Sequence, residues 1–118
     1  MIEPPFQWQV VRAQLDPTRG SEQAGTRPVL IVSREGMNTR LPVVTVLPLT
    51  TLRSGRRVYP TEVLLPQQTG GQPNASIIMA HQIRTLAKER LLETYGHLED
   101  ESLREQIRQA LKTHLDLR

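Results

Sequence analysis

The chain contains several short hydrophobic segments. Some alternate with polar positions, and others are runs of aliphatic residues. Trp8–Leu15 alternates loosely, Arg27–Ser33 contains four consecutive aliphatic residues, and Val43–Leu49 is rich in β-branched residues. Alternation predicts a strand with one buried face, whereas a short aliphatic run predicts a strand buried on both faces. Two further strands are predicted at Tyr59–Leu65 and Ala75–Ala80. The pattern therefore predicts a mainly β fold.

Proline- and glycine-bearing segments separate these strands. We expect residues 1–7, which contain two consecutive prolines, to form an extended tail on the surface. Asp16–Thr26 is a long polar loop, and loops of this length in compact domains are usually functional or disordered. Turns are predicted at Glu35–Leu41 and at Pro66–Asn74, the latter around a Gly-Gly pair.

The basic connection Thr50–Val58 joins two predicted strands, Val43–Leu49 and Tyr59–Leu65, which we expect to pair as a hairpin. Pro48 predicts a sheet edge or a bulge for the first of these strands, because proline has no N–H to donate to the ladder. His81–Gly96 mixes helical and extended signals and gives no single assignment.

The clearest helix is predicted at Asp100–Leu115. Acidic residues at its start favour a helix N-terminus. Its apolar face is formed by residues at helical spacing, namely Leu103, Ile107, Ala110, Leu111, His114 and Leu115. We therefore expect one domain over residues 1–118, a small barrel-like β fold with a C-terminal helix appended.

Charge and composition narrow the function classes. The chain carries a formal net charge of +3, and its first sixty residues hold eight arginines against four acids. Arginine suits bidentate phosphate contact, although a solvated basic surface fits the composition equally well. With no cysteine in the sequence, disulfides, thiolate catalysis and cysteine-based zinc sites are excluded. The three histidines show no ligand spacing, so neither a metal nor another cofactor is predicted.

Membrane and secretory signals are not found in the sequence. No apolar stretch approaches the ~20 residues of a membrane span, and the first residues lack the basic and apolar regions of a signal peptide. We therefore expect a cytoplasmic protein without membrane contact. One tryptophan, one phenylalanine and two tyrosines leave few platforms for base stacking, which argues against an RRM-like or extended OB-type surface.

Arg27 is the first candidate for chemistry. It begins a buried strand, and Pro28 biases it toward an extended conformation, so a rigid element holds its guanidinium. An always-charged group is better suited to clamping a phosphate than to proton transfer, and the alternative is an arginine simply solvated at a strand end. Thr50 ends the next predicted strand, and the two side chains converge if these strands are neighbours. The two glycines of the Asp16–Thr26 loop, Gly20 and Gly25, match neither a dinucleotide-binding nor a P-loop pattern.

Four motifs, in order, resemble the signature of MazF/PemK-type toxin endoribonucleases. The longest is Leu15–Leu30, with the pattern LDPTxGSEQAGxRPVL, and it is followed by Pro48–Thr50, Tyr59–Val63 and Gln82–Thr85. Together they cover roughly residues 9–115. The resemblance implies an SH3-like or CcdB/MazF-like barrel, a homodimer, and metal-independent cleavage of single-stranded RNA. It also implies a cognate MazE-like antitoxin whose tail occupies the RNA groove.

By this resemblance, Arg27 and Thr50 match the family's catalytic arginine and threonine. We expect the ribose 2′-hydroxyl to attack phosphorus and to leave 2′,3′-cyclic phosphate and 5′-hydroxyl ends. Glu22, the carboxylate nearest to Arg27 in the sequence, is either the general base or part of a structural ion pair. The predicted RNA-binding residues are Ser21, Gln23, Arg57, Gln82 and Arg84.

Two alternatives from other classes remain. A CcdB-like gyrase inhibitor on the same fold would use C-terminal aromatic and hydrophobic contacts, but this chain ends at Leu115–Arg118 without an aromatic residue. The other alternative is an RNA- or partner-binding barrel whose catalytic pair is idle. Release of cyclic-phosphate ends from a labelled RNA separates the enzyme from both.

Overall fold

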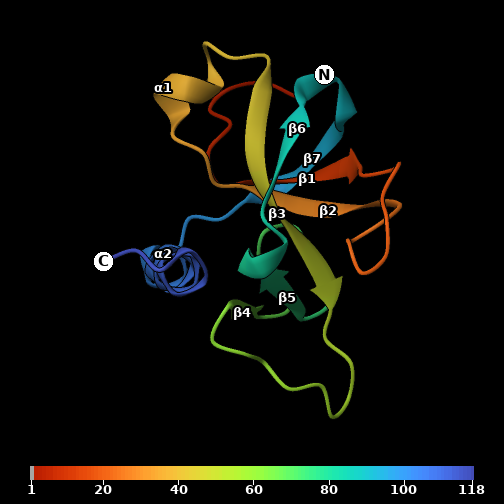
Figure 1. Ribbon diagram of the computed structural model, residues 1–118, viewed down its shortest axis with the longest axis vertical. Coiled ribbons are helices and arrows are strands. Elements are labelled where there is room, and N and C mark those ends of the chain that lie inside the picture. The colour runs from red at the N-terminus through yellow and green to blue at the C-terminus, as the bar shows by residue number, and fades with distance from the viewer. Residues whose placement is uncertain (1) are drawn as a thin grey trace.

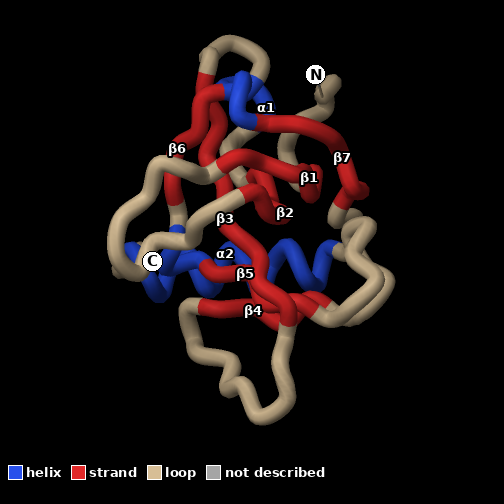
Figure 2. Tube along the Cα trace, turned by 90° about the vertical axis from the view of Figure 1, so that its right-hand side faces the viewer, coloured by secondary structure: helices blue, strands red, loops and turns tan. Residues whose placement is uncertain are grey.

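The computed structural model describes residues 2–118, which form seven strands, two α-helices and two short 3-10 helices (Figure 1, Figure 2). Every strand pair is antiparallel, in the order β4-β5-β3-β2-β1-β7, and β6 pairs with β3 outside this path. The elements in chain order are β1 (Gln9–Gln14), β2 (Thr26–Ile31), α1 (Glu35–Asn38), β3 (Val43–Thr51), β4 (Glu62–Leu65), β5 (Ser76–Met79), η1 (Ala80–Gln82), β6 (Arg84–Ala87), η2 (Lys88–Arg90), β7 (Leu91–His97) and α2 (Glu101–Leu115).

Two hydrophobic clusters form the core. One contains Val10, Leu30 and Leu103, and so joins β1 and β2 to the long helix α2, which lies beside β4 and η1 (Figure 1). The other contains Val11 and Ile31, the next residues along the same two strands. Since successive strand residues point to opposite faces, β1 and β2 are buried on both faces, as predicted for the aliphatic run in β2. Each fully buried aliphatic side chain contributes about 1.5–3 kcal/mol.

The predicted surface tail over residues 1–7 is wrong for Ile2 and Phe6, whereas residues 3–5 are exposed and Met1 lies outside the described residues. Ile2 and Phe6 are buried in the second cluster. The backbone N–H groups of Phe6 and Gln7 donate to the carboxylate of Glu35, over 2.9 and 2.8 Å. Burial by itself raises the pKa of Glu35, but these donors outweigh it and hold the pKa below its ordinary value. The predicted turn after β2 thus contains α1, whose acid anchors the N-terminal segment.

β3 is the strand on which the other elements converge. It pairs with β2 on one side, where Val29 lies opposite Pro48, and on the other side with β6 and then with β5. The prediction of a sheet edge at Pro48 is therefore wrong. The segment containing η1 separates β6 from β5 at this level, so on that side the missing N–H of the proline costs no ladder hydrogen bond.

The predicted hairpin across the basic connection is also wrong, because β5 lies between β3 and β4. Ile77 of β5 lies opposite Thr50 of β3 and opposite Leu64 of β4. All four residues of β5 are buried, as expected for a strand with neighbours on both sides, whereas β4 is an edge strand and exposes Leu64. Hairpin loops use about 2–5 residues, and the longer connection over residues 52–61 allows this insertion.

The C-terminal helix is confirmed. Asp100 is its N-cap, and the carboxylate Oδ1 accepts a hydrogen bond from the N–H of Leu103 over 3.2 Å. Of the predicted apolar face, Leu103, Ile107 and Ala110 are buried, whereas His114 and Leu115 are exposed, so the buried face ends earlier than predicted. The segment with mixed signals, His81–Gly96, contains most of η1, all of β6 and η2, and β7 up to its last residue but one.

Candidate active site

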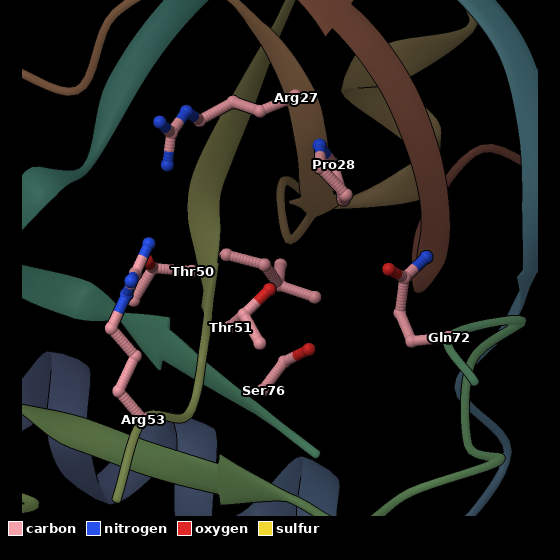
Figure 3. A pocket seen from close by; sticks show the side chains of 8 residues that line it. Arg27, Pro28, Thr50, Thr51, Arg53, Gln72 and Ser76 are labelled. Carbon is pink, nitrogen blue, oxygen red and sulfur yellow. The ribbon is translucent and has the colours of Figure 1, made fainter. Parts of the chain in front are cut away.

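A pocket of about 230 Å³ lies where the start of β2 meets the end of β3. The two strands are antiparallel, and continuing the register of Val29 opposite Pro48 by two residues places Arg27 across from Thr50. The structure therefore brings both predicted catalytic residues to one pocket. Its polar lining, shown in Figure 3, is formed by Arg27, Thr50, Thr51, Arg53, Gln72 and Ser76.

The pocket is positively charged. Its charged lining residues are Arg27 and Arg53, and neither a carboxylate nor a histidine lines it among residues 2–118. The other polar groups are hydroxyls and one amide, which donate or accept without a net charge. Two guanidinium groups without an acid beside them favour an anion, and their planar arrangement of donors matches phosphate.

Arg27 is held by the loop that precedes β2. Its Nε donates to the carbonyl oxygen of Ala24 over 2.9 Å, and its Nη1 donates to Oε1 of Gln23 over 2.5 Å. A guanidinium carries five N–H donors, so these two bonds fix its orientation and leave other donors for a ligand. The arginine is half-buried, and the side chain is thus positioned before any ligand binds.

The same loop is attached to η1 through Gln82. The Nε2 of Gln82 donates to the carbonyl oxygen of Ser21 over 3.1 Å, and its Oε1 accepts from the N–H of Gln23 over 3.3 Å. Three of the predicted RNA-binding residues therefore bind one another in this structure. Through Gln23, this network reaches the guanidinium of Arg27.

Glu22 lies in the loop but does not line the pocket. Its Oε1 accepts a hydrogen bond from the N–H of Arg19 over 2.7 Å, and the N–H of Glu22 donates back to the carbonyl oxygen of Arg19. Within residues 2–118, Glu22 forms no ion pair, so the predicted structural ion pair is wrong. Its carboxylate instead braces the loop through a backbone N–H. The general-base role stays a prediction.

None of the five predicted RNA-binding residues lines the pocket, and Arg57 and Arg84 also stand outside the Gln82 network. Arg57 is exposed, and its guanidinium carbon lies 5.5 Å from the ring centroid of Tyr59. Arg84 begins β6 opposite Val46, and its Nη1 is buried without a hydrogen-bond partner in the described part of the chain. The structure thus does not place Arg57 or Arg84 in the pocket lining, and their contact with RNA stays a prediction.

Arg53 is the pocket residue that the sequence did not distinguish from its neighbours. It lies in the same basic connection as Arg56 and Arg57. Arg56 binds Glu62 through Nη1 and Nη2, over 3.0 and 2.7 Å, and the Glu62 side chain is only 1% exposed. The Arg56 guanidinium holds the pKa of the Glu62 carboxyl below its ordinary value, despite the opposing effect of burial. This ion pair fixes the connection and removes Arg56 from the pocket.

The turn that carries Gln72 is packed on β7. Gly71 has a φ of +74°, and a Cβ built there would lie 2.1 Å from the carbonyl oxygen of Tyr95. Gly96 is similarly close to the backbone of Gly70 and Gly71. Only glycine fits such a contact between backbones, and the contact sets the position of Gln72 at the pocket.

Two further findings concern the described residues as a whole. In residues 2–118, no group of three or more histidine, cysteine, aspartate or glutamate side chains is placed to hold a metal ion. No helix in that range has the length and apolar character needed to cross a membrane.

Known proteins resemble this chain in both sequence and structure. A family model for PemK-like, MazF-like toxins of type II toxin–antitoxin systems matches residues 6–115. A relative, endoribonuclease MazF9 of Mycobacterium tuberculosis, is 44% identical over 115 residues, which cover 93% of this chain and 92% of the relative. A mycobacterial endoribonuclease solved in complex with its cognate antitoxin is 31% identical, with a TM-score of 0.78 and 97% of each chain covered. MazF from Deinococcus radiodurans has a TM-score of 0.79 at 26% identity, over 96% of this chain and 97% of the other.

The predicted fold, a mainly β MazF-like barrel with a C-terminal helix, is confirmed by these neighbours and by the strand order. The four motifs that carry the resemblance lie in the matched region, which spans nearly the whole chain. The family model matches most of the chain, and the 44% identity extends over 92% of the relative, so the likeness is one of sequence as well as of fold. The chain therefore belongs to the PemK-like and MazF-like toxins of type II toxin–antitoxin systems.

Proposed function

We propose that this toxin is an endoribonuclease that cleaves single-stranded RNA in the pocket of Arg27 and Thr50. The observation that carries the proposal is that these two residues, far apart in the sequence, line one positively charged pocket. The 44% identical relative is named an endoribonuclease, which supports the same activity. RNA presents one negative charge per phosphate, and the free guanidinium donors of Arg27 match it.

The reaction requires little apparatus. The ribose 2′-oxygen is already adjacent to the phosphorus, so the substrate supplies proximity. The 2′-hydroxyl gives its proton to solvent as a bond forms between the 2′-oxygen and phosphorus, and the leaving 5′-oxygen takes a proton from solvent as its bond to phosphorus breaks. Products are a 2′,3′-cyclic phosphate and a 5′-hydroxyl. Arg27 stabilises the charge that grows on the phosphate, and the hydroxyl of Thr50 orients the phosphate or the attacking group.

The chemistry uses no metal or other cofactor in this proposal, because guanidinium groups supply the positive charge at the phosphate. Glu22 acts in the proposal as a loop brace, since its Oε1 already accepts from the N–H of Arg19 and it lies outside the pocket lining. The variant Glu22→Gln distinguishes this role from the competing assignment of Glu22 as general base. The proton of the 2′-hydroxyl then leaves to solvent.

The proposal extends to partners. A solved mycobacterial neighbour is a complex of an endoribonuclease with its cognate antitoxin, and Deinococcus radiodurans MazF is solved with MazE. We infer that a cognate MazE-like antitoxin neutralises this chain by covering the basic pocket. The homodimer and the cytoplasmic location rest on family membership.

Cleavage of an end-labelled, single-stranded RNA pool in excess EDTA tests the proposal. The wild-type protein should release fragments with 2′,3′-cyclic phosphate and 5′-hydroxyl ends, and Arg27→Ala and Thr50→Ala should each lose about 100-fold or more in rate. Arg40→Ala removes an exposed arginine elsewhere and serves as the control. Full activity of Arg27→Ala would refute the assignment, and loss of wild-type activity in EDTA would refute the metal-free route. A wild-type protein that binds RNA without cleaving it would be a binding barrel.

A further inference from the structure

Arg53 lines the pocket but has no role in the reaction derived above. It lies two residues beyond the end of β3, and hydrogen bonds of the backbone set its position. The N–H of Leu52 donates to the carbonyl oxygen of Ala75 over 2.9 Å, and the N–H of Arg56 donates to the carbonyl oxygen of Arg53 over 3.0 Å. The side chain of Arg53 therefore starts from a fixed turn at the wall of the pocket.

The three arginines of the connection have different surroundings. Arg56 is engaged by the buried carboxylate of Glu62, and the guanidinium of Arg57 lies over the ring of Tyr59. Arg53 forms no ion pair and no side-chain hydrogen bond with any of residues 2–118, and it is exposed. It is thus the arginine of this connection whose donors are left for a ligand in the pocket.

Arg27 and Arg53 enter the pocket from opposite walls. Figure 3 shows their guanidinium groups extending toward the same space, beside Thr50. Two like charges in this arrangement repel each other, and an anion between them reverses the sign of the interaction. At about 230 Å³ the pocket is below the ~300 Å³ of typical small-molecule sites, which suits one phosphate with part of its sugar.

We propose that Arg53 binds the scissile phosphate together with Arg27, so that two arginines clamp the reacting group. This inference rests on the proposed function and adds a second catalytic residue to it. When the 2′-oxygen bonds to phosphorus, the phosphate changes from one negative charge toward two. A second guanidinium therefore stabilises the transition state more than the bound substrate, and its loss lowers kcat more than it raises KM.

The experiment uses single-turnover cleavage of an RNA with one cleavage site. We expect Arg53→Ala to reduce the rate by about 10- to 100-fold, and Arg53→Lys to recover part of the loss because it keeps the charge but not the fork. Arg40→Ala, which removes one exposed positive charge elsewhere, should match the wild type. Binding of the same RNA with a 2′-deoxy sugar at the cleavage site is measured in parallel. The slope of log affinity against log salt should fall by about 0.7 in Arg53→Ala, as for one lost phosphate contact on a single strand.

A sulfur substitution identifies the phosphate. Replacing one non-bridging oxygen of the scissile phosphate by sulfur weakens guanidinium contacts, so the wild type should slow with the sulfur substrate. Arg53→Ala should slow less, because the contact is already absent. An equal sulfur effect in both proteins would overturn the inference, as would a full loss of rate in Arg57→Ala with none in Arg53→Ala. If the wild type cleaves, Arg27→Ala is inactive and Arg53→Ala is fully active, the inference fails while the proposed function stands. A wild type that cleaves no RNA overturns both.

Discussion

Removal of Arg56 should destabilise the protein through the acid that it leaves behind. Arg56 donates two hydrogen bonds to Glu62, and the remaining donor to this carboxylate is the N–H of Tyr59, over 3.0 Å. With Arg56 in place the Glu62 side chain is 1% exposed, so the arginine and one backbone N–H are its main partners. In Arg56→Ala a nearly buried carboxylate therefore keeps one donor and loses its counter-charge.

The size of the effect follows from this geometry. Breaking a buried ion pair by removing one partner costs about 3–5 kcal/mol. The Arg56 side chain is itself 30% exposed, and solvent screening reduces its contribution. We therefore expect Arg56→Ala to lower the free energy of unfolding by about 2–4 kcal/mol at pH 7. The variant Glu62→Gln, combined with Arg56→Ala, should recover part of this loss because it removes the unpaired charge.

The pH dependence provides the second half of the test. The pKa of Glu62 is lowered in the folded protein, so its contribution is present above the unfolded value of about 4.3 and is lost as pH falls through the folded value. The difference between wild type and Arg56→Ala should therefore shrink as the solution is acidified from pH 7 to below pH 4. Urea unfolding followed by the fluorescence of Trp8, at one protein concentration, measures it. A difference under about 1 kcal/mol at pH 7, or one independent of pH, would refute the reasoning.

Three further variants test the site. Gln82→Ala removes two loop hydrogen bonds worth about 1–3 kcal/mol together, so hydrogen exchange at the Gln23 amide should accelerate by about tenfold with little change in thermal midpoint. Glu22→Gln keeps an acceptor for the loop N–H and should retain at least about a third of kcat, whereas a loss beyond about 100-fold would identify a general base. Gly71→Ala should lower the free energy of unfolding by about 2–4 kcal/mol, because its Cβ meets backbone at positive φ; Gly36→Ala, with open space around it, should change it by less than about 0.5 kcal/mol.

The convergence of Arg27 and Thr50 was predictable on the condition that their two strands are neighbours in the sheet, which the structure confirms. One residue begins a strand, the other ends the next strand, and neighbouring antiparallel strands bring such ends together. The C-terminal helix was equally accessible, since its apolar spacing and its cap lie within one segment. For the helix the signal comes from residues close together in the sequence, whereas the resemblance to a known family singled out Thr50 as the partner of Arg27.

The choice among the three arginines of the connection was not predictable in this way. Arg57 was expected to meet RNA, but Arg53 lines the pocket, because Glu62 withdraws Arg56 and the ring of Tyr59 lies by Arg57. The wrong hairpin has a similar origin, since β5 arrives between β3 and β4 from later in the chain. Such outcomes depend on three-dimensional packing between segments that no periodicity reports.

The central position of β3 has a consequence for how the site moves. Thr50 pairs with Ile77 of β5 and lies in a strand that pairs with β2 on one side and with β6 and β5 on the other, so its backbone moves only when the sheet itself opens. The loop around Gln23 is joined to the rest by a few side-chain bonds and opens at far lower free energy. Arg27 itself lies in β2 opposite Ala13 of β1, so opening of the loop releases its side chain while its backbone stays in the sheet. A substrate or an antitoxin can therefore displace the loop that orients the Arg27 guanidinium while the backbones of Arg27 and Thr50 stay fixed in the sheet.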